Sequence, residues 1–191
     1  MGIILASTSP RRKELLERMG LDFVVRVAHH DETMNPFNNP AEEVARVSAL
    51  KARAVYPNCL DDDIIISADT IVVCDGLMMG KPHSESEAFS MLRRLSGRDH
   101  QVMTGLTILE GEREETTTVT TTLRFRHLSD EEIRAYIATR EPMDKAGAYA
   151  IQGYAAMFVV GLDGDYYNVM GLPVCTLTLM LRRLGVKLLG C

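Results

Sequence analysis

The sequence predicts an α/β protein in which a mixed sheet is flanked by helices, and three observations support this prediction. Short β-branched or apolar runs alternate along the chain with segments of helical periodicity. Helix-capping residues precede the expected helices, and Asp75-Gly76 is a typical hairpin turn. The alternating threonines between residues 115 and 126 favour an antiparallel strand pair over a helix. Interleaved helices and strands of this kind pack as helices on a sheet.

The first half of the chain alternates strands with helices. Residues 3–6 are apolar and typical of a buried strand, while Gly20 and Asn39-Pro40 mark a helix end and a helix start. The expected elements are a strand at 3–6, a helix at 9–19, a strand at 23–27, a helix at 40–55, and strands at 64–66 and 71–74.

The second half adds hairpins and two clear capping boxes. Ser84 with Glu87, and Ser129 with Glu132, have the spacing in which a hydroxyl and a carboxylate cap a helix reciprocally. The expected elements are a helix at 84–95, strands at 101–109 and 115–126, a helix at 129–139, a strand at 158–162 and a helix at 173–184.

Composition and charge exclude several classes of function. The 191 residues are 46% hydrophobic and 25% charged, which is ordinary for a globular protein. The net charge of −5 argues against general binding to nucleic acid or to an anionic membrane. The four cysteines are scattered, and no apolar run is long enough to span a bilayer. We therefore expect a cytoplasmic protein without nucleic-acid or membrane partners.

The first helix starts with an unfavourable charge pattern. Ser9-Pro10 is a good helix start, but Arg11, Arg12 and Lys13 then fill the first turn. The helix dipole is positive at this end, so each cation there costs about 0.3–1 kcal/mol. A bound anion would relieve this repulsion, because free N–H groups and arginines both bind phosphate. The pattern predicts an anion site in the loop from Ser7, although an arginine on a solvated face is the alternative.

Carboxylates follow two of the expected strands. Asp69 comes directly after an apolar strand. A carboxylate there either caps a turn, or binds a divalent metal or takes a proton from a water molecule. Asp31-Glu32 follows another strand and is either a solvated pair or part of a cation site. With a phosphate site nearby, these carboxylates predict a shared Mg²⁺ or Mn²⁺, since hard cations bridge carboxylates and phosphates.

Two lysines complete the set of candidate residues. Lys51 lies on a helix, and Lys81 lies in Gly80-Lys81-Pro82, where Gly permits close backbone approach and Pro stiffens the loop. Each is either a phosphate ligand or a solvated surface residue. The chain contains neither a Walker A loop nor a GxGxxG fingerprint.

Six stretches that span nearly the whole chain form one distinctive set. They are LASTSPRR at 5–12, SADTIVV at 67–73, GKP at 80–82, SGRDHQVMTG at 96–105, EPMDKAGAYAIQG at 141–153 and GDYYNVMGLP at 164–173. Together and in this order, they resemble the motifs of one known family, the Maf-like nucleoside triphosphate pyrophosphatases.

The resemblance implies a fold like that of inosine triphosphate pyrophosphatases. Residues 1–191 would form a single Maf-like domain with an elongated sheet, two lobes and a central cleft. It further implies hydrolysis of a nucleoside triphosphate to the monophosphate and pyrophosphate with a divalent cation, Mg²⁺ or Mn²⁺. The intact EPMDKAGAYAIQG segment is similar to that of the subfamily that acts on dTTP and UTP.

The resemblance also implies roles for individual residues. Asp69 matches the proton acceptor, and Asp69 with Glu32 would hold the metal. The positions linked to substrate choice match Arg11, Thr70 and Gln152. The positions expected to hold phosphate match Ser7, Arg12, Lys51, Lys81 and Lys145.

Alternative functions remain open at this point. A sister subfamily acts on 7-methyl-GTP, and the family name has been attached to non-catalytic, nucleotide-binding regulators of cell division. A pure binder needs the cations but not Asp69, so the presence of Asp69 favours an enzyme. The sequence leaves the oligomeric state open between a monomer and a homodimer.

Overall fold

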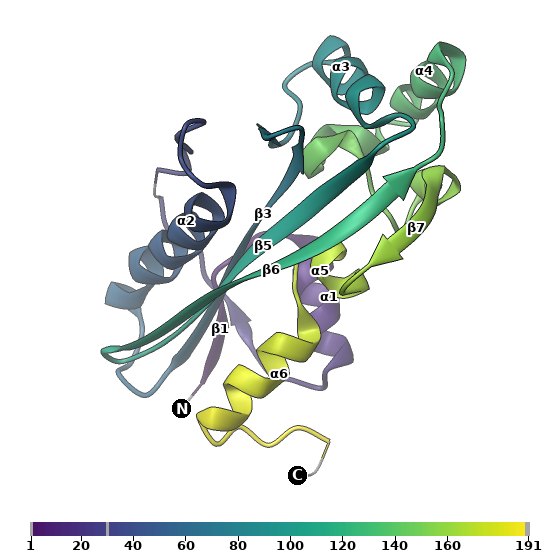
Figure 1. The fold of residues 1–191 in the computed structure, drawn as a ribbon. Coiled ribbons are helices and arrows are strands. Elements are labelled where there is room, and N and C mark those ends of the chain that lie inside the picture. Colours follow the sequence, from purple (N-terminus) through teal and green to yellow (C-terminus); the bar gives the residue numbers. More distant parts are fainter. Residues whose placement is uncertain (1, 30, 190–191) are drawn as a thin grey trace. The chain divides into compact units, whose positions relative to one another are not determined.

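The computed structural model describes residues 2–29 and 31–189, whose strands form one mixed sheet (Figure 1). Seven strands occur among these residues, in the order β2-β1-β3-β5-β6-β7 with β4 paired to β3. Pairing is parallel for β1 with β2 and β3, and antiparallel for β3 with β4 and for β6 with β7. The strands are β1 (Ile3–Leu5), β2 (Val24–Val25), β3 (Ile64–Cys74), β4 (Leu77–Met79), β5 (Asp99–Glu110), β6 (Arg113–Phe125) and β7 (Val159–Asp163).

Six α-helices are found in the same described part of the chain, and short 3₁₀ helices connect several elements. The α-helices are α1 (Pro10–Arg18), α2 (Pro40–Val55), α3 (Glu85–Leu95), α4 (Asp130–Ala138), α5 (Tyr166–Met170) and α6 (Val174–Arg183). The prediction of an α/β fold with a mixed sheet flanked by helices is confirmed. None of the helices within residues 2–29 and 31–189 has the length and apolar character needed to cross a membrane.

The chain divides into two compact units, and β3, β5 and β6 contribute residues to both. The first unit comprises Met1–Asp69, Thr104–Val119 and Gly171–Cys191. The second comprises Thr70–Met103 and Thr120–Met170. The expected single domain over residues 1–191, with two lobes and a central cleft, stays a prediction.

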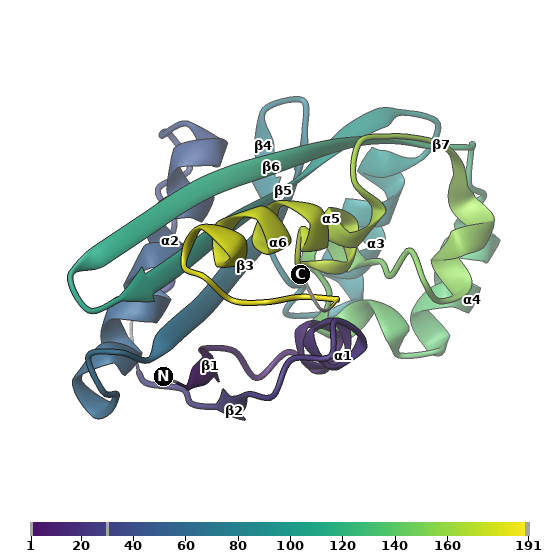
Figure 2. The same cartoon turned by 90° about the horizontal axis from the view of Figure 1, so that it is seen from below.

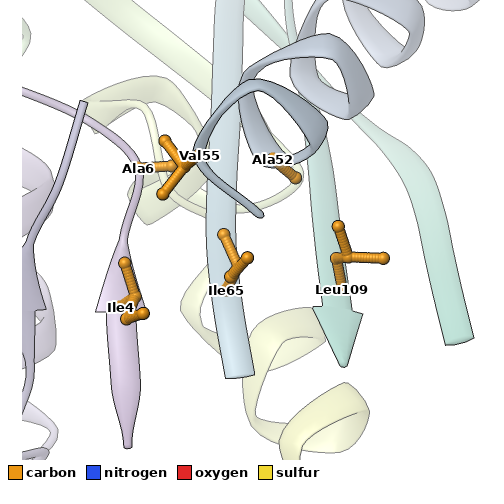
Figure 3. Close-up of a cluster of buried hydrophobic side chains, with 6 residues drawn as sticks. All are labelled: Ile4, Ala6, Ala52, Val55, Ile65 and Leu109. Atoms are coloured by element: carbon orange, nitrogen blue, oxygen red, sulfur yellow. The ribbon is translucent and has the colours of Figure 1, made fainter. Parts of the chain in front are cut away.

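The core of the first unit lies between α2 and three strands (Figure 3). Ala52 and Val55 of α2 pack against Ile4 of β1, Ile65 of β3 and Leu109 of β5. Strand neighbours that point to the opposite face, such as Ile64 and Ile66, are also fully buried. Burial on both faces explains why these strands read as continuous apolar runs and not as alternating patterns.

Gly105 of β5 brings α2 still closer to the sheet. A Cβ atom at this position would lie 2.3 Å from the carbonyl oxygen of Val44 in α2. Only glycine therefore fits here. The final Gly of the SGRDHQVMTG stretch, Gly105, thus has a packing role, because its missing side chain leaves room for the α2 backbone. The close approach fixes the height of α2 above the strands that carry the site.

On another side of the first unit, α1 lies beside the segment that leads into α6 (Figure 2). The buried guanidinium of Arg12 in α1 donates from Nε to the backbone oxygen of Gly171 at 2.7 Å. Leu15 and Leu16 of α1 are also buried. The hydrogen bond from Arg12 thus joins the buried N-terminal helix to the segment that precedes α6.

In the second unit, local signals form the turns and helix starts that the sequence predicts. Asp75 and Gly76 both have positive φ values, 51° and 76°, and connect β3 to β4. Such values at both central residues are those of the tight hairpin turn that Asp-Gly favours. Ser129 and Glu132 form a complete capping box at the start of α4.

The same unit has an aromatic core around a buried histidine. His100 makes edge-to-face contacts with Phe125 and Tyr149, and its Nε2 lies 2.8 Å from the Tyr149 hydroxyl. Burial lowers the pKa of His100 to about 4. The folded protein therefore keeps this imidazole neutral at pH values where an unfolded chain would protonate it.

Stability should consequently fall on mild acidification. Because the folded pKa of His100 lies below the ordinary value of 6.5, its contribution is complete above pH 6.5 and is lost as the pH falls toward 4. Between about pH 7.5 and about pH 5 the expected loss is roughly 2 kcal/mol of unfolding free energy. Urea unfolding of His100→Gln should show a flatter pH dependence, whereas His127→Gln, at an exposed position, should match the wild type. Equal slopes for wild type and His100→Gln would show that His100 does not carry this effect.

Two strand predictions were wrong in extent. Residues 64–66 and 71–74 belong to one continuous strand, β3, so Asp69 lies within a strand and does not follow one. The polar residues Ser67 and Asp69 do not interrupt it, because their side chains find partners on α2. The strand expected at 23–27 is only the two-residue β2.

Candidate active site

Residues of β3 and α2 that face one another build the centre of the site in the first unit. Alternate residues of a strand share one face, and Ile65, Ser67 and Asp69 all face α2. Ser67 Oγ donates to the backbone oxygen of Ser48 at 2.7 Å. Lys51 Nζ donates to Asp69 Oδ1 at 2.6 Å. The same strand periodicity that buries Ile65 thus presents the Asp69 carboxylate to the helix.

Lys51 lies between two carboxylates. Its Nζ is 2.6 Å from Asp69 Oδ1 and 3.4 Å from Glu32 Oε1. The side chains of Lys51 and Asp69 are only 11% and 14% exposed, whereas that of Glu32 is 57% exposed. Helical side chains lean toward the helix N-terminus, which carries the Lys51 stem along α2 toward these acids. The structure therefore brings together three predicted residues that are widely separated in sequence.

Ser7 and Arg12 form the adjoining part of the site. Arg12 Nη1 donates to Ser7 Oγ at 3.1 Å, and the same oxygen accepts from the Ser9 N–H at 3.2 Å. Burial lowers the pKa of Arg12, and the opposing charges of Asp69 and Glu32 partly offset this effect. The guanidinium remains charged, as arginine does in proteins. The buried cation and the two carboxylates are thus electrostatically coupled within one unit.

The three cations at the start of α1 differ in their surroundings. Arg12 is buried, Arg11 is partly buried, and Lys13 is exposed and lies 3.8 Å from Glu17. Ser9 occupies the N-cap position but makes no side-chain capping bond, and no acidic residue lies in the first turn. The positive end of α1 therefore has neither the side-chain cap nor the acidic residue that commonly offsets the helix dipole. A bound anion could supply the missing negative charge.

The other four predicted residues, Thr70, Lys81, Lys145 and Gln152, belong to the second unit. The Gly80 carbonyl, next to Lys81, accepts from the Gly147 N–H at 3.0 Å, which joins the GKP loop to the segment that follows Lys145. Lys145 is 14% exposed and ion-pairs with Asp144, whereas Lys81 and Gln152 are exposed.

Glu141 and Tyr136 support the loop that carries Gln152, and sequence reasoning missed both. Tyr136 donates its hydroxyl proton to Glu141 Oε1 at 2.7 Å and accepts from the Ala150 N–H at 3.1 Å. Glu141 Oε2 accepts from the Tyr154 N–H at 3.1 Å. A Cβ at Gly153 would lie 2.1 Å from this carboxylate, so a side chain there would displace Glu141 from its present position. Burial and the bond to Glu141 raise the pKa of Tyr136, which remains a donor.

Asp69 and Glu32 fit a divalent cation that phosphate oxygens complete. Both carboxylates border the same Lys51 Nζ, at 2.6 and 3.4 Å, and therefore line one small space. Mg²⁺ is commonly held by one or two carboxylates together with substrate phosphates and water. Throughout residues 2–29 and 31–189, no group of three or more His, Cys, Asp or Glu side chains could hold a metal by itself. The donor set suits a cation shared with a ligand and not an all-protein cage.

Several known proteins are similar to this chain over nearly its full length. A dTTP/UTP pyrophosphatase of Symbiobacterium thermophilum is 50% identical over 96% of this chain and 94% of its own length. A dTTP/UTP pyrophosphatase of Moorella thermoacetica is 46% identical over 98% of this chain and 97% of its own length. The structure of the Staphylococcus aureus Ham1 protein matches with a TM-score of 0.54 at 13% identity, over 96% of this chain and 99% of that one, which shows a shared fold. The model of the family described as Maf-like protein matches residues 2–184, so the chain belongs to the Maf-like protein family.

Proposed function

We propose that this protein hydrolyses dTTP and UTP to the monophosphate and pyrophosphate. The names of relatives at 46–50% identity over nearly the full length support this substrate pair. The observation that carries the chemistry is the Asp69–Lys51–Glu32 cluster beside the buried Arg12. It combines carboxylates for a water molecule and a cation with positive charge for phosphate.

Asp69 is the proposed proton acceptor. Lys51 Nζ lies 2.6 Å from Asp69 Oδ1, and we assign the Asp69 carboxylate to take the proton from the attacking water. Carboxylates ordinarily have a pKa near about 3.9 and are weak bases at neutral pH. A Mg²⁺ or Mn²⁺ held by Asp69 and Glu32 would lower the pKa of the water and neutralise charge on the phosphates. Attack at the α-phosphorus would then release pyrophosphate.

Phosphate binding is assigned to the cations and to the start of α1. The proposed residues are Ser7, Arg12 and Lys51 of the first unit and Lys81 and Lys145 of the second. Arg12 donates hydrogen bonds from Nε to the Gly171 carbonyl and from Nη1 to Ser7 Oγ. We therefore assign it two contributions to phosphate binding, its positive charge and the orientation of Ser7. Pyrophosphate would leave with its negative charge stabilised by these groups.

Base selection is assigned to Arg11, Thr70 and Gln152. A hydroxyl and an amide can hydrogen-bond the edge of a pyrimidine, and a site built for such bonds rejects bases that leave them unpaired. The Gln152 loop is held by Glu141 and Tyr136, which provides the rigidity that selection requires.

The test is a comparison of pyrophosphate release from dTTP, UTP, CTP, dATP and 7-methyl-GTP at equal concentrations with Mg²⁺ or Mn²⁺. We expect dTTP and UTP to be hydrolysed fastest and chelator to abolish release. A clear preference for 7-methyl-GTP would assign the chain to the sister activity. Tight nucleotide binding without any pyrophosphate release would indicate a regulator instead.

Free thiols support a cytoplasmic location. Cys59, Cys74 and Cys175 are unpaired, and such cysteines persist in a reducing compartment. The proposed substrates are also cytoplasmic metabolites, which is consistent with this location.

A further inference from the structure

We propose that Lys51 is an exchangeable counter-ion that excludes the divalent cation until the triphosphate binds. In the structure its ammonium lies between Asp69 and Glu32. When a triphosphate arrives, Lys51 transfers to a phosphate oxygen and releases both carboxylates for the metal. This inference rests on the proposed function, because it assumes a triphosphate ligand at this cluster.

The contacts of Lys51 compete directly with those of a cation. Its Nζ is 2.6 Å from Asp69 Oδ1 and 3.4 Å from Glu32 Oε1, the two carboxylates that fit a shared metal. An ammonium and a divalent cation cannot both occupy the space between these oxygens. Lys51 and Asp69 are largely shielded from water, so their attraction is only weakly screened by salt. Free metal must therefore displace an internal ion pair before it can bind.

Lys51 can move, whereas the neighbouring Arg12 cannot. A lysine carries a compact charge on a flexible four-carbon stem, which suits it to exchange one oxygen partner for another. Arg12 is buried and held by the Gly171 carbonyl at 2.7 Å and by Ser7 Oγ at 3.1 Å. Within the described residues, Lys51 forms ion pairs with the two carboxylates that a metal can take over. Arg12 is thus the fixed cation of the site, and Lys51 is the exchangeable one.

The exchange couples the two ligands. A triphosphate offers Lys51 a new anionic partner, and the metal then gives Asp69 and Glu32 a replacement cation. Each ligand removes an obstacle to the other, so the affinities must rise together and by the same factor. The site would take up metal and nucleotide jointly and would bind free metal poorly.

The test measures Mn²⁺ binding by electron paramagnetic resonance, without turnover. Without nucleotide, Lys51→Met should bind Mn²⁺ about tenfold or more tightly than the wild type, within the usual range of coupling between sites. A non-hydrolysable dTTP analogue with an imido link between the α- and β-phosphates should tighten Mn²⁺ binding to the wild type. It should do so much less for Lys51→Met. Lys13→Met, which removes an exposed lysine from α1, should behave as the wild type.

Unchanged or weaker Mn²⁺ binding by nucleotide-free Lys51→Met would overturn the inference. If this variant does not fold, Lys51→Gln, which also removes the charge, is measured in its place and judged by the same criterion. The proposed function is tested separately by pyrophosphate release from dTTP by the wild type. Hydrolysis of dTTP with no gain in Mn²⁺ affinity on neutralising Lys51 would refute the counter-ion role alone. A gain in affinity without dTTP hydrolysis would refute the proposed function alone.

Discussion

Asp69→Asn is expected to lower the rate of pyrophosphate release from dTTP by about 10²–10⁴-fold, the usual cost of losing a catalytic base. An amide cannot accept the proton of the attacking water and is a poorer cation ligand than a carboxylate. In the wild type, Lys51 Nζ lies 2.6 Å from Asp69 Oδ1. The amide oxygen of Asn can still accept this hydrogen bond, so the fold should be retained. Turnover is measured at saturating dTTP and Mg²⁺, and circular dichroism checks the fold.

Asp99→Asn is the matched control for this substitution. Asp99 is also an aspartate of a sheet strand, but it is exposed and pairs with Arg124 at 2.6 Å. Exposed pairs of this kind contribute about 0–1 kcal/mol, so both turnover and stability should stay near the wild type. Near-wild-type turnover of Asp69→Asn with metal present would show that Asp69 is not the proton acceptor.

Arg12→Ala is expected to have the largest effect on stability, a loss of about 3–5 kcal/mol of unfolding free energy. The substitution removes the bonds to the Gly171 carbonyl at 2.7 Å and to Ser7 Oγ at 3.1 Å. It takes this donor from the Gly171 carbonyl and one of two donors from Ser7 Oγ, and it removes the hydrogen bond between α1 and the segment before α6. Urea unfolding of the nucleotide-free protein measures the loss.

Lys13→Ala provides the comparison within the same helical turn. Lys13 is exposed and its contact with Glu17 is long, at 3.8 Å, so its replacement should change stability by less than about 0.5 kcal/mol. Triphosphate should raise the thermal midpoint of wild type and Lys13→Ala alike, and much less that of Arg12→Ala. Equal unfolding free energies for the two alanine variants would contradict the structural role of Arg12.

The parts of the fold that the sequence predicted well depend on local interactions. Asn39 caps α2 through the Ala41 N–H, Ser129 and Glu132 cap α4, and Asp75-Gly76 turns β3 into β4. Each signal involves residues at most three positions apart, so no tertiary information is needed. The helix and strand types that follow from these signals are confirmed.

The continuity of β3 could not be predicted in the same way. Ser67 and Asp69 resemble a break between two strands, because polar side chains are costly inside a sheet. Their partners, Ser48 and Lys51, lie 19 and 18 residues away and are supplied by α2. The strand continues because a neighbouring helix satisfies its polar residues, and a local pattern does not contain that information.

The candidate site was predictable as a set of residues but not as a set of contacts. The resemblance identified Arg12, Lys51 and Asp69, and the dipole argument pointed to α1. One partner of Arg12 is Gly171, 159 residues away, and no local pattern reveals this contact. The Tyr136–Glu141 pair had a visible signal in the EPMDKAGAYAIQG stretch, whose first residue is Glu141.

The most direct test of the central claim is hydrolysis of dTTP in water labelled with heavy oxygen, followed by mass spectrometry of both products. Water attack at the α-phosphorus places the label in dTMP and leaves the pyrophosphate unlabelled. We expect the label only in dTMP for the wild type, and almost no labelled product for Asp69→Asn. Label in pyrophosphate, or release of orthophosphate with dTDP, would contradict a pyrophosphatase mechanism at this site.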